Sequence, residues 1–192
     1  VAAAMAREAD VILALGTRLG FNTTFYSYDN ISSKAKIIQV EIEPTAIGRF
    51  FPVAIGICGN AGQVAEQLAR CLNGHTPTAA SGWSKDFQSK RRGMLADRDA
   101  SAPGGEPIQP AGLFKALRAV LPKDAMYTID AGTLCLQATD QLEYHVPPAL
   151  FSPLDFGLVG FSYACGLGVK VGCPDRTVVS LMGDGGFGMT MS

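Results

Sequence analysis

An aspartate set between glycines follows an apolar run near the end of the chain. Residues 177–182 read Thr-Val-Val-Ser-Leu-Met, which predicts a buried strand, and Gly183-Asp184-Gly185-Gly186 comes directly after them. A parallel strand would carry Asp184 to the carboxyl edge of a sheet, where open α/β folds bind ligands. Glycines let backbone N–H groups approach a phosphate closely, and a carboxylate beside a diphosphate suits Mg²⁺. Taken alone, a Gly-Asp-Gly sequence is more typical of a tight turn with a surface aspartate.

The segments before this turn alternate short apolar runs with helical patterns, which predicts parallel strands connected by helices. Apolar runs that predict buried strands stand at residues 10–16, 35–43, 53–58, 125–130 and 177–182. Helical spacing predicts helices over 83–98, 110–121 and 162–171 and another that begins near 60. Pro44 suits the first turn of a short helix through Arg49, and residues 17–33 predict an irregular segment.

Two such α/β patterns are separated by a segment rich in Gly, Pro, Ser, Thr and Ala. We expect residues 1–73 to be the C-terminal part of a central, Rossmann-like domain and residues 108–192 the N-terminal part of a second domain. Residues 74–107 are expected to form a linker with one helix, and 101–107 the boundary itself. The predicted fold class is therefore α/β, with two incomplete doubly wound parallel-sheet domains joined by a linker. Because the chain opens inside a helical pattern and stops directly after the glycine-rich turn, we expect a piece of a longer polypeptide.

The composition excludes several classes of function. Sixteen Lys and Arg against seventeen Asp and Glu give a net charge of -1, which offers no attraction to nucleic acid or to an anionic membrane surface. The longest apolar runs are too short to span a bilayer. The five cysteines show no CxxC spacing and predict buried thiols in a reducing compartment, hence a cytoplasmic protein.

The neighbourhood of Asp184 resembles a known cofactor domain. Residues 153–168, Pro174-Asp175-Arg176 and the Gly-Asp-Gly turn together resemble the diphosphate-binding domain of thiamine-diphosphate enzymes, in the acetolactate synthase and pyruvate decarboxylase superfamily. Residues 9–18 and 37–49 independently resemble the central domain of acetolactate synthase large subunits. Two blocks in the order of the family are more specific than either block alone.

The resemblance implies thiamine diphosphate and Mg²⁺ as cofactors and assigns roles by position. Asp184 would be the first protein ligand of Mg²⁺, and Gly185 and Gly186 would offer backbone N–H groups to the diphosphate. Val159 would wedge between the two rings of the cofactor, and the Gly157 carbonyl would accept a hydrogen bond from the aminopyrimidine. The whole implied cofactor-binding set is Gly132, Thr133, Gly157, Leu158, Val159, Gly183, Asp184, Gly185 and Gly186.

A second ligand is implied for the first half of the chain. In acetolactate synthases the corresponding central domain binds FAD, and here Gly16, Arg18, Glu41 and Glu43 stand where a nucleotide's phosphate and ribose would meet the protein. A central domain with a merely structural role is the alternative, because the segment lacks GxGxxG spacing.

The resemblance implies an enzyme that decarboxylates a 2-oxo acid and joins the product to a second carbonyl compound, as acetolactate synthase does. A 2-oxo acid or acyl-CoA decarboxylase of the same superfamily is the first alternative, and a non-catalytic nucleotide-binding module the second. No catalytic residue is expected here, because the family's glutamate belongs to an N-terminal domain and its second metal ligand would follow Ser192. We therefore expect this chain to be inactive by itself and its parent to be a homo-oligomer, a dimer or tetramer.

Overall fold

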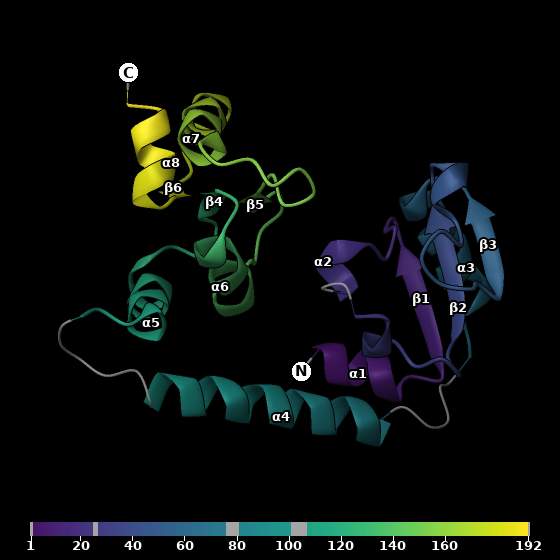
Figure 1. Cartoon of the computed structure of the whole chain (residues 1–192). Coiled ribbons are helices and arrows are strands. Elements are labelled where there is room, and N and C mark those ends of the chain that lie inside the picture. Colours follow the sequence, from purple (N-terminus) through teal and green to yellow (C-terminus); the bar gives the residue numbers. More distant parts are fainter. Residues whose placement is uncertain (1, 25–26, 76–80, 101–106, 192) are drawn as a thin grey trace. The chain divides into compact units, whose positions relative to one another are not determined.

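The computed structural model describes residues 2–24, 27–75, 81–100 and 107–191. Residues 101–106 of the expected boundary, and residues 76–80 of the expected linker, lie outside the described residues. The chain forms two compact units, Val1–Gly93 and Met94–Ser192, which divide within helix α4 (Ser81–Ala100) (Figure 1). Each unit contains a parallel sheet, so the predicted α/β class with two parallel sheets is confirmed. Within the described residues, every helix is too short or too polar to cross a lipid bilayer.

The first unit is built on three parallel strands in the order β1-β2-β3. Their bounds are β1 Val11–Leu15, β2 Lys36–Glu41 and β3 Ile55–Cys58. The helices around them are α1 Ala2–Glu8, α2 Phe21–Thr24 and α3 Ala61–Cys71. Two short 3₁₀ turns, η1 Tyr28–Asn30 and η2 Pro44–Ala46, complete the unit. Its apolar core gathers Ala14, Leu19, Ile31, Ile37 and Phe51.

Two expectations for this unit were wrong in detail. Residues 17–33 contain α2 and η1 rather than only irregular chain. The helix expected from Pro44 to Arg49 is the single 3₁₀ turn η2, whose first turn is capped because the Glu43 carboxylate accepts from the Thr45 N–H at 3.1 Å. The cap at Glu43 stabilises this one turn, and the helical conformation ends at Ala46.

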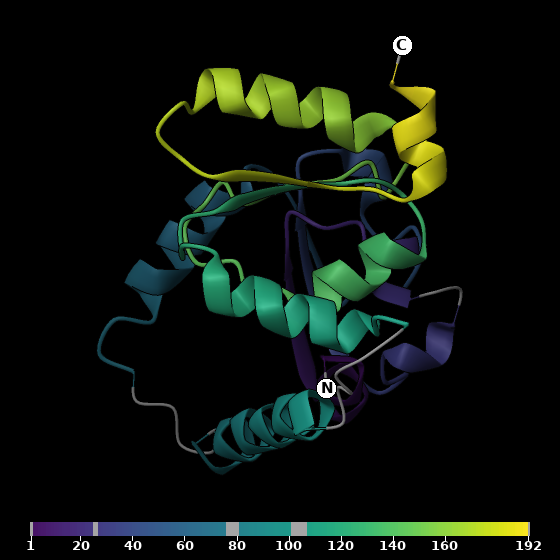
Figure 2. The same cartoon turned by 90° about the vertical axis from the view of Figure 1, so that its left-hand side faces the viewer.

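The second unit has a parallel sheet in the order β5-β4-β6, with helices on both of its faces. Its strands are β4 Met126–Ile129, β5 Leu150–Phe151 and β6 Val178–Leu181. Its helices after α4 are α5 Pro110–Val120, α6 Thr133–Gln141, α7 Phe161–Gly172 and α8 Asp184–Met189. In Figure 2, α5 and α6 lie on one face of the sheet and α7 lies on the other. This is the doubly wound arrangement.

Side chains of β4 alternate between the two faces, as the period of a strand requires. Tyr127 and Ile129 join the apolar core with Phe114 of α5 and Cys135 of α6. Thr128 points the other way and bonds to α7, since its hydroxyl donates to the Ser162 carbonyl at 2.9 Å. The α7 side of β4 therefore carries the polar groups Thr128 and, directly after the strand, Asp130, and the candidate site develops on that side.

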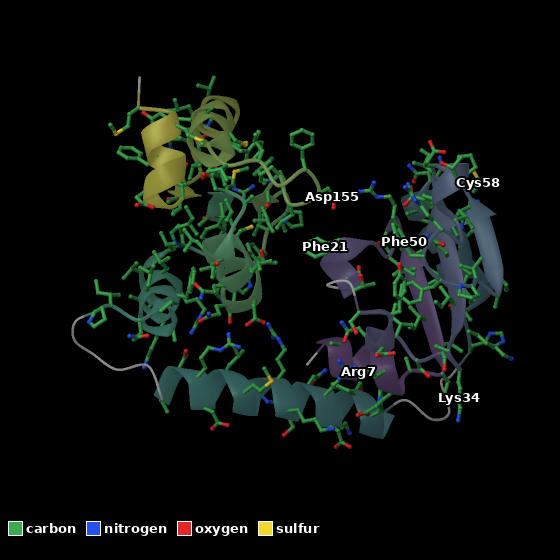
Figure 3. The ribbon with its side chains drawn as sticks, viewed as in Figure 1. Arg7, Phe21, Lys34, Phe50, Cys58 and Asp155 are labelled. Carbon is green, nitrogen blue, oxygen red and sulfur yellow. The ribbon has the colours of Figure 1, made fainter. Side chains whose placement is uncertain are left out.

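The sequence did not predict three elements of this unit. Helix α6 and the two-residue strand β5 were not expected, and α8 occupies positions where only a turn was expected. The expectation that all five cysteines are buried was also wrong. Cys58 at the end of β3 and Cys71 at the end of α3 are exposed, and Cys135 is buried; Figure 3 labels Cys58.

Candidate functional site

Three loops of the second unit meet at the carboxyl edge of its sheet. The first follows β4, the second precedes α7 and the third follows β6. The Asp130 N–H donates to the Leu181 carbonyl at 3.0 Å, which joins the ends of β4 and β6. The Ala131 N–H donates to the Leu158 carbonyl at 3.3 Å, which ties the first loop to the second. The chain passes from β4 to β5 on one side of β4 and then to β6 on its other side. This reversal makes the carboxyl edge at β4 the switch point, where open α/β sheets bind ligands.

Asp130 connects β4 to the beginning of α7. Its side chain is 3% exposed, and both carboxylate oxygens accept backbone hydrogen bonds. Oδ2 accepts from the Gly160 N–H at 2.9 Å, and Oδ1 accepts from the Ser162 N–H at 2.5 Å. Gly160 is the N-cap residue of α7 and has φ +88°, a conformation that favours glycine. The carboxylate therefore caps α7 from a neighbouring strand and fixes where the preceding loop ends.

The turn after β6 combines open and crowded glycines. Asp184 is exposed and begins α8, and a Cβ added at Gly183 or Gly185 would meet no described atom within 4 Å. Gly186 differs, because a Cβ there would lie 2.0 Å from Asp130 Oδ2. Gly183 and Gly185 leave their backbone open to a ligand, whereas Gly186 makes room for the Asp130 carboxylate.

The loop before α7 presents exposed backbone and apolar side chains. Gly157 is exposed, and its N–H donates to the Pro153 carbonyl at 2.7 Å. The side chains of Leu158 and Val159 are 45% and 41% exposed, although both are apolar. Exposed apolar side chains beside an open glycine turn can contact the ring of an organic ligand.

The loop after β4 leads into α6. Gly132 and Thr133 are exposed, and the Gly132 carbonyl accepts from the N–H groups of Cys135 and Leu136 at 3.1 and 3.3 Å. These two residues therefore lie at the same sheet edge as the other loops, through the Ala131 link to Leu158.

A layer of hydroxyl groups supports the loops from below. Thr128 and Ser162 are fully buried, and the Ser162 hydroxyl donates to the Thr128 carbonyl at 2.7 Å. The hydroxyls of Thr128 and Ser180 lie 2.9 Å apart, within hydrogen-bond distance. These bonds join β4, β6 and α7 directly beneath Asp130, which gives the three loops a rigid base.

The donor set fits a diphosphate with Mg²⁺ better than a metal held by protein alone. Across the described residues, no three His, Cys, Asp or Glu side chains gather closely enough to hold a metal ion. One exposed carboxylate, at Asp184, stands among open backbone positions. Mg²⁺ is commonly held by one or two carboxylates together with phosphate oxygens and waters, which is the arrangement this edge can supply.

In the first unit, the structure brings Gly16 and Glu41 to one sheet edge. The Gly16 N–H donates to the Val40 carbonyl at 2.8 Å, which places it beside the end of β2. Both acidic side chains serve local turns: Glu41 Oε1 accepts from the Ile42 N–H at 2.9 Å, and Glu43 Oε1 accepts from the Thr45 hydroxyl at 2.8 Å. The Thr45 hydroxyl, followed by its backbone N–H, lowers the pKa of Glu43. Arg18 is exposed beyond the end of β1. Binding of a nucleotide at this edge stays a prediction.

Comparison with protein families accounts for both halves of the chain. Residues 1–68 match the family described as "Thiamine pyrophosphate enzyme, central domain". Residues 130–192 match "Thiamine pyrophosphate enzyme, C-terminal TPP binding domain". The chain belongs to the thiamine pyrophosphate enzymes. Thiamine pyrophosphate is another name for thiamine diphosphate, and every residue of the implied cofactor set lies inside the second match.

Individual curated proteins are similar to nearly the whole chain. A probable sulfoacetaldehyde acetyltransferase of Rhizobium meliloti is 33% identical, over 96% of this chain and 34% of the relative. A probable 2-ketoarginine decarboxylase AruI of Pseudomonas aeruginosa is 30% identical, over 95% of this chain and 31% of the relative. The acetolactate synthase large subunit of Haemophilus influenzae is 28% identical, over 96% and 32%. The chain spans about a third of the length of these curated relatives.

Sequence reasoning missed the groups that hold the three loops together. Asp130 was assigned only to the end of a strand, and the hydroxyls of Thr128, Ser162 and Ser180 were not singled out. One signal was available, because a charged residue that ends an otherwise neutral buried strand needs a partner. The identity of that partner depends on the fold.

Proposed function

We propose that the loops at the β5-β4-β6 edge form part of a site for thiamine diphosphate and Mg²⁺, in a protein that acts on 2-oxo acids. The observation that carries the proposal is the meeting of three glycine-containing loops at the switch point of a parallel sheet, with the exposed carboxylate of Asp184 in one of them. The family match over residues 130–192 supports it, and it also favours an enzyme over a non-catalytic nucleotide-binding module.

Each loop would contribute a different kind of contact. Asp184 would coordinate Mg²⁺, and the backbone N–H groups of Gly183, Gly185 and Gly186 would face the diphosphate. Gly132 and Thr133 would contact the diphosphate from the loop after β4. The Gly157 carbonyl would accept a hydrogen bond from the cofactor's aminopyrimidine, with Leu158 and Val159 against its rings. The bound cofactor supplies the chemistry at the carbonyl carbon, and the chain's residues hold and orient it.

The proposed reaction of the whole protein is decarboxylation of a 2-oxo acid followed by carboligation, as in acetolactate synthase. A second candidate is acyl transfer with sulfoacetaldehyde, because the Rhizobium meliloti acetyltransferase is 33% identical and the acetolactate synthase 28%. FAD binding at Gly16, Arg18, Glu41 and Glu43, and assembly into a homo-oligomer, are further parts of the acetolactate synthase proposal.

Calorimetric titration of the complete protein with thiamine diphosphate tests the site, with and without Mg²⁺. We expect binding that requires Mg²⁺ and that weakens by about tenfold or more in Asp184→Asn, since a charge-assisted ligand is lost. Asp175→Asn is the matched control, because Asp175 is an exposed aspartate in the turn before β6. Wild-type protein that fails to bind, or equal binding by both variants, would contradict the site. Activity with pyruvate and with sulfoacetaldehyde then separates the two reactions.

A further inference from the structure

We infer that Asp130 is a positioning residue of the cofactor site, one that acts through backbone groups and touches no cofactor itself. This inference rests on the proposed function. The structure assigns Asp130 a position between two of the three loops, where it fixes one relative to the other. These are the loop that ends at Gly160 and the turn that contains Gly186. Neither the family match nor the relatives' names assign this role.

Backbone N–H groups at the beginning of α7 bind both carboxylate oxygens of Asp130. Asp130 is 3% exposed, and each oxygen accepts one backbone hydrogen bond, from Gly160 and from Ser162. Hydrogen bonds to an ionised group are roughly twice as strong as neutral ones, and a buried charge without them is strongly unfavourable. The loop before α7 therefore cannot leave the end of β4 without exposing or stranding this charge.

The Asp130 carboxylate also lies against the turn after β6, at Gly186. A Cβ at Gly186 would lie 2.0 Å from Oδ2, the oxygen that accepts from Gly160, and 3.2 Å from the carboxylate carbon. The side chain of Asp130 is short and bonded at both oxygens, so it cannot turn aside without releasing a backbone partner. Any side chain at position 186 would therefore push on the Gly157–Gly160 loop through Asp130.

The site thus couples its two glycine-rich loops through one buried side chain. The residues proposed to face the pyrimidine ring, Gly157 and Val159, precede Gly160 by three residues or fewer. Gly186, one of the residues proposed to face the diphosphate, lies against the same carboxylate from the other side. A fixed Asp130 sets the distance between the ring contacts and the diphosphate contacts.

Two variants perturb this carboxylate in different ways. Asp130→Asn keeps the size but offers one oxygen, so one of the two backbone N–H groups must face an amide NH₂. Gly186→Ala leaves Asp130 intact and displaces it by overlap. Gly188→Ala is the control for alanine in α8, because a Cβ there meets no described atom within 4 Å. Phe114→Leu is the control for stability, since Phe114 is fully buried on the opposite face of the sheet.

Two readouts on the complete protein separate positioning from general destabilisation. The first is the dissociation constant of thiamine diphosphate in the presence of Mg²⁺. We expect it to rise about tenfold or more in Asp130→Asn and in Gly186→Ala, and to stay within about twofold in Gly188→Ala and Phe114→Leu. The second is hydrogen exchange of the cofactor-free protein. The Gly160 and Ser162 amides should exchange faster in the first two variants, relative to the amides of α5, and not in the controls.

The outcomes distinguish this inference from the proposed function. If wild-type protein does not bind thiamine diphosphate, the proposed function fails, and the exchange data still report whether Asp130 anchors the loop. If wild-type protein binds and Asp130→Asn binds equally well, the positioning role is overturned. If Asp130→Asn does not fold, Gly186→Ala decides, because unchanged affinity there has the same consequence.

Discussion

Replacing Gly166 with alanine should destabilise the second unit, although alanine is the better helix former. Gly166 lies in the middle of α7 and is buried against the sheet. A Cβ at this position would lie 2.0 Å from Ser180 Oγ and 3.1 Å from Thr128 Oγ1. Both hydroxyls belong to the layer that joins β4, β6 and α7; Thr128 is fully buried and Ser180 is half-buried.

The change in the free energy of unfolding that we expect for Gly166→Ala is the sum of opposing effects. Alanine gains about 1 kcal/mol over glycine in a helix interior. Overpacking of a tight interior costs about 1–3 kcal/mol, and separating the bonded hydroxyls of Thr128 and Ser180 adds about 1 kcal/mol. Gly166→Ala should therefore lose about 1–3 kcal/mol in net terms. Gly168→Ala should gain up to about 1 kcal/mol, because a Cβ at Gly168 meets no described atom within 4 Å.

Urea unfolding followed by far-UV circular dichroism measures the difference between these two variants, which we expect to be about 1–4 kcal/mol. A double-mutant cycle with Ser180→Ala identifies the cause, since it removes the nearest overlapping atom. The cost of Gly166→Ala should fall by about 1 kcal/mol or more in that background. If Gly166→Ala proves as stable as Gly168→Ala, α7 does not pack on the hydroxyl layer as described, and the base of the proposed site is wrong.

Two further predictions concern groups outside the loops. Burial raises the pKa of Tyr127 and of Tyr144 above the ordinary 10.0. Both phenols therefore stay neutral in the folded state at a pH where those of the unfolded chain ionise. The free energy of unfolding should keep its full value below about pH 10 and fall above it. Unfolding midpoints measured between about pH 8 and 11 should show this loss, and Tyr144→Phe should reduce it, whereas a flat profile would contradict the burial of these rings. For the thiols, Ellman's reagent should modify exposed Cys58 and Cys71 in the folded chain and reach buried Cys135 only after unfolding. Rapid modification of Cys135 without urea would show that its helix is not packed as described.

The strands that the sequence predicted are those that lie in a continuous apolar run. The expectation that all of them are buried was wrong for β1 and β3, since Val11 and Ile55 are 56% and 52% exposed. Residues 10–16 and 177–182 contain β1 and β6 with errors of one residue at the ends. Strand β5 is a different case, because its two residues, Leu150 and Phe151, pair with β4 only through the tertiary fold. Helix α6 was missed because its first turn follows a glycine and its sequence contains β-branched threonines, which weaken the helical signal.

The candidate site was predictable in its composition and not in its internal connections. The position of Asp184 at a strand's carboxyl end could be read from the run that precedes it, and the structure has the same arrangement. The bonds of Asp130 could not be read in this way, since its partners Gly160 and Ser162 lie 30 and 32 residues further along the chain. Only the winding of α7 over the sheet brings them within hydrogen-bond distance.

The glycines of the Gly-Asp-Gly-Gly turn show why residue type alone does not give a residue's role. From the sequence, Gly185 and Gly186 had one explanation in common, the approach of backbone to a phosphate. In the structure a side chain at Gly185 would meet no described atom within 4 Å, while one at Gly186 would overlap the Asp130 carboxylate. Gly185 can therefore be required only by something outside the described residues, such as a ligand. Gly186 is required by the fold itself, and the effect of alanine at each position before any cofactor is added separates these two requirements.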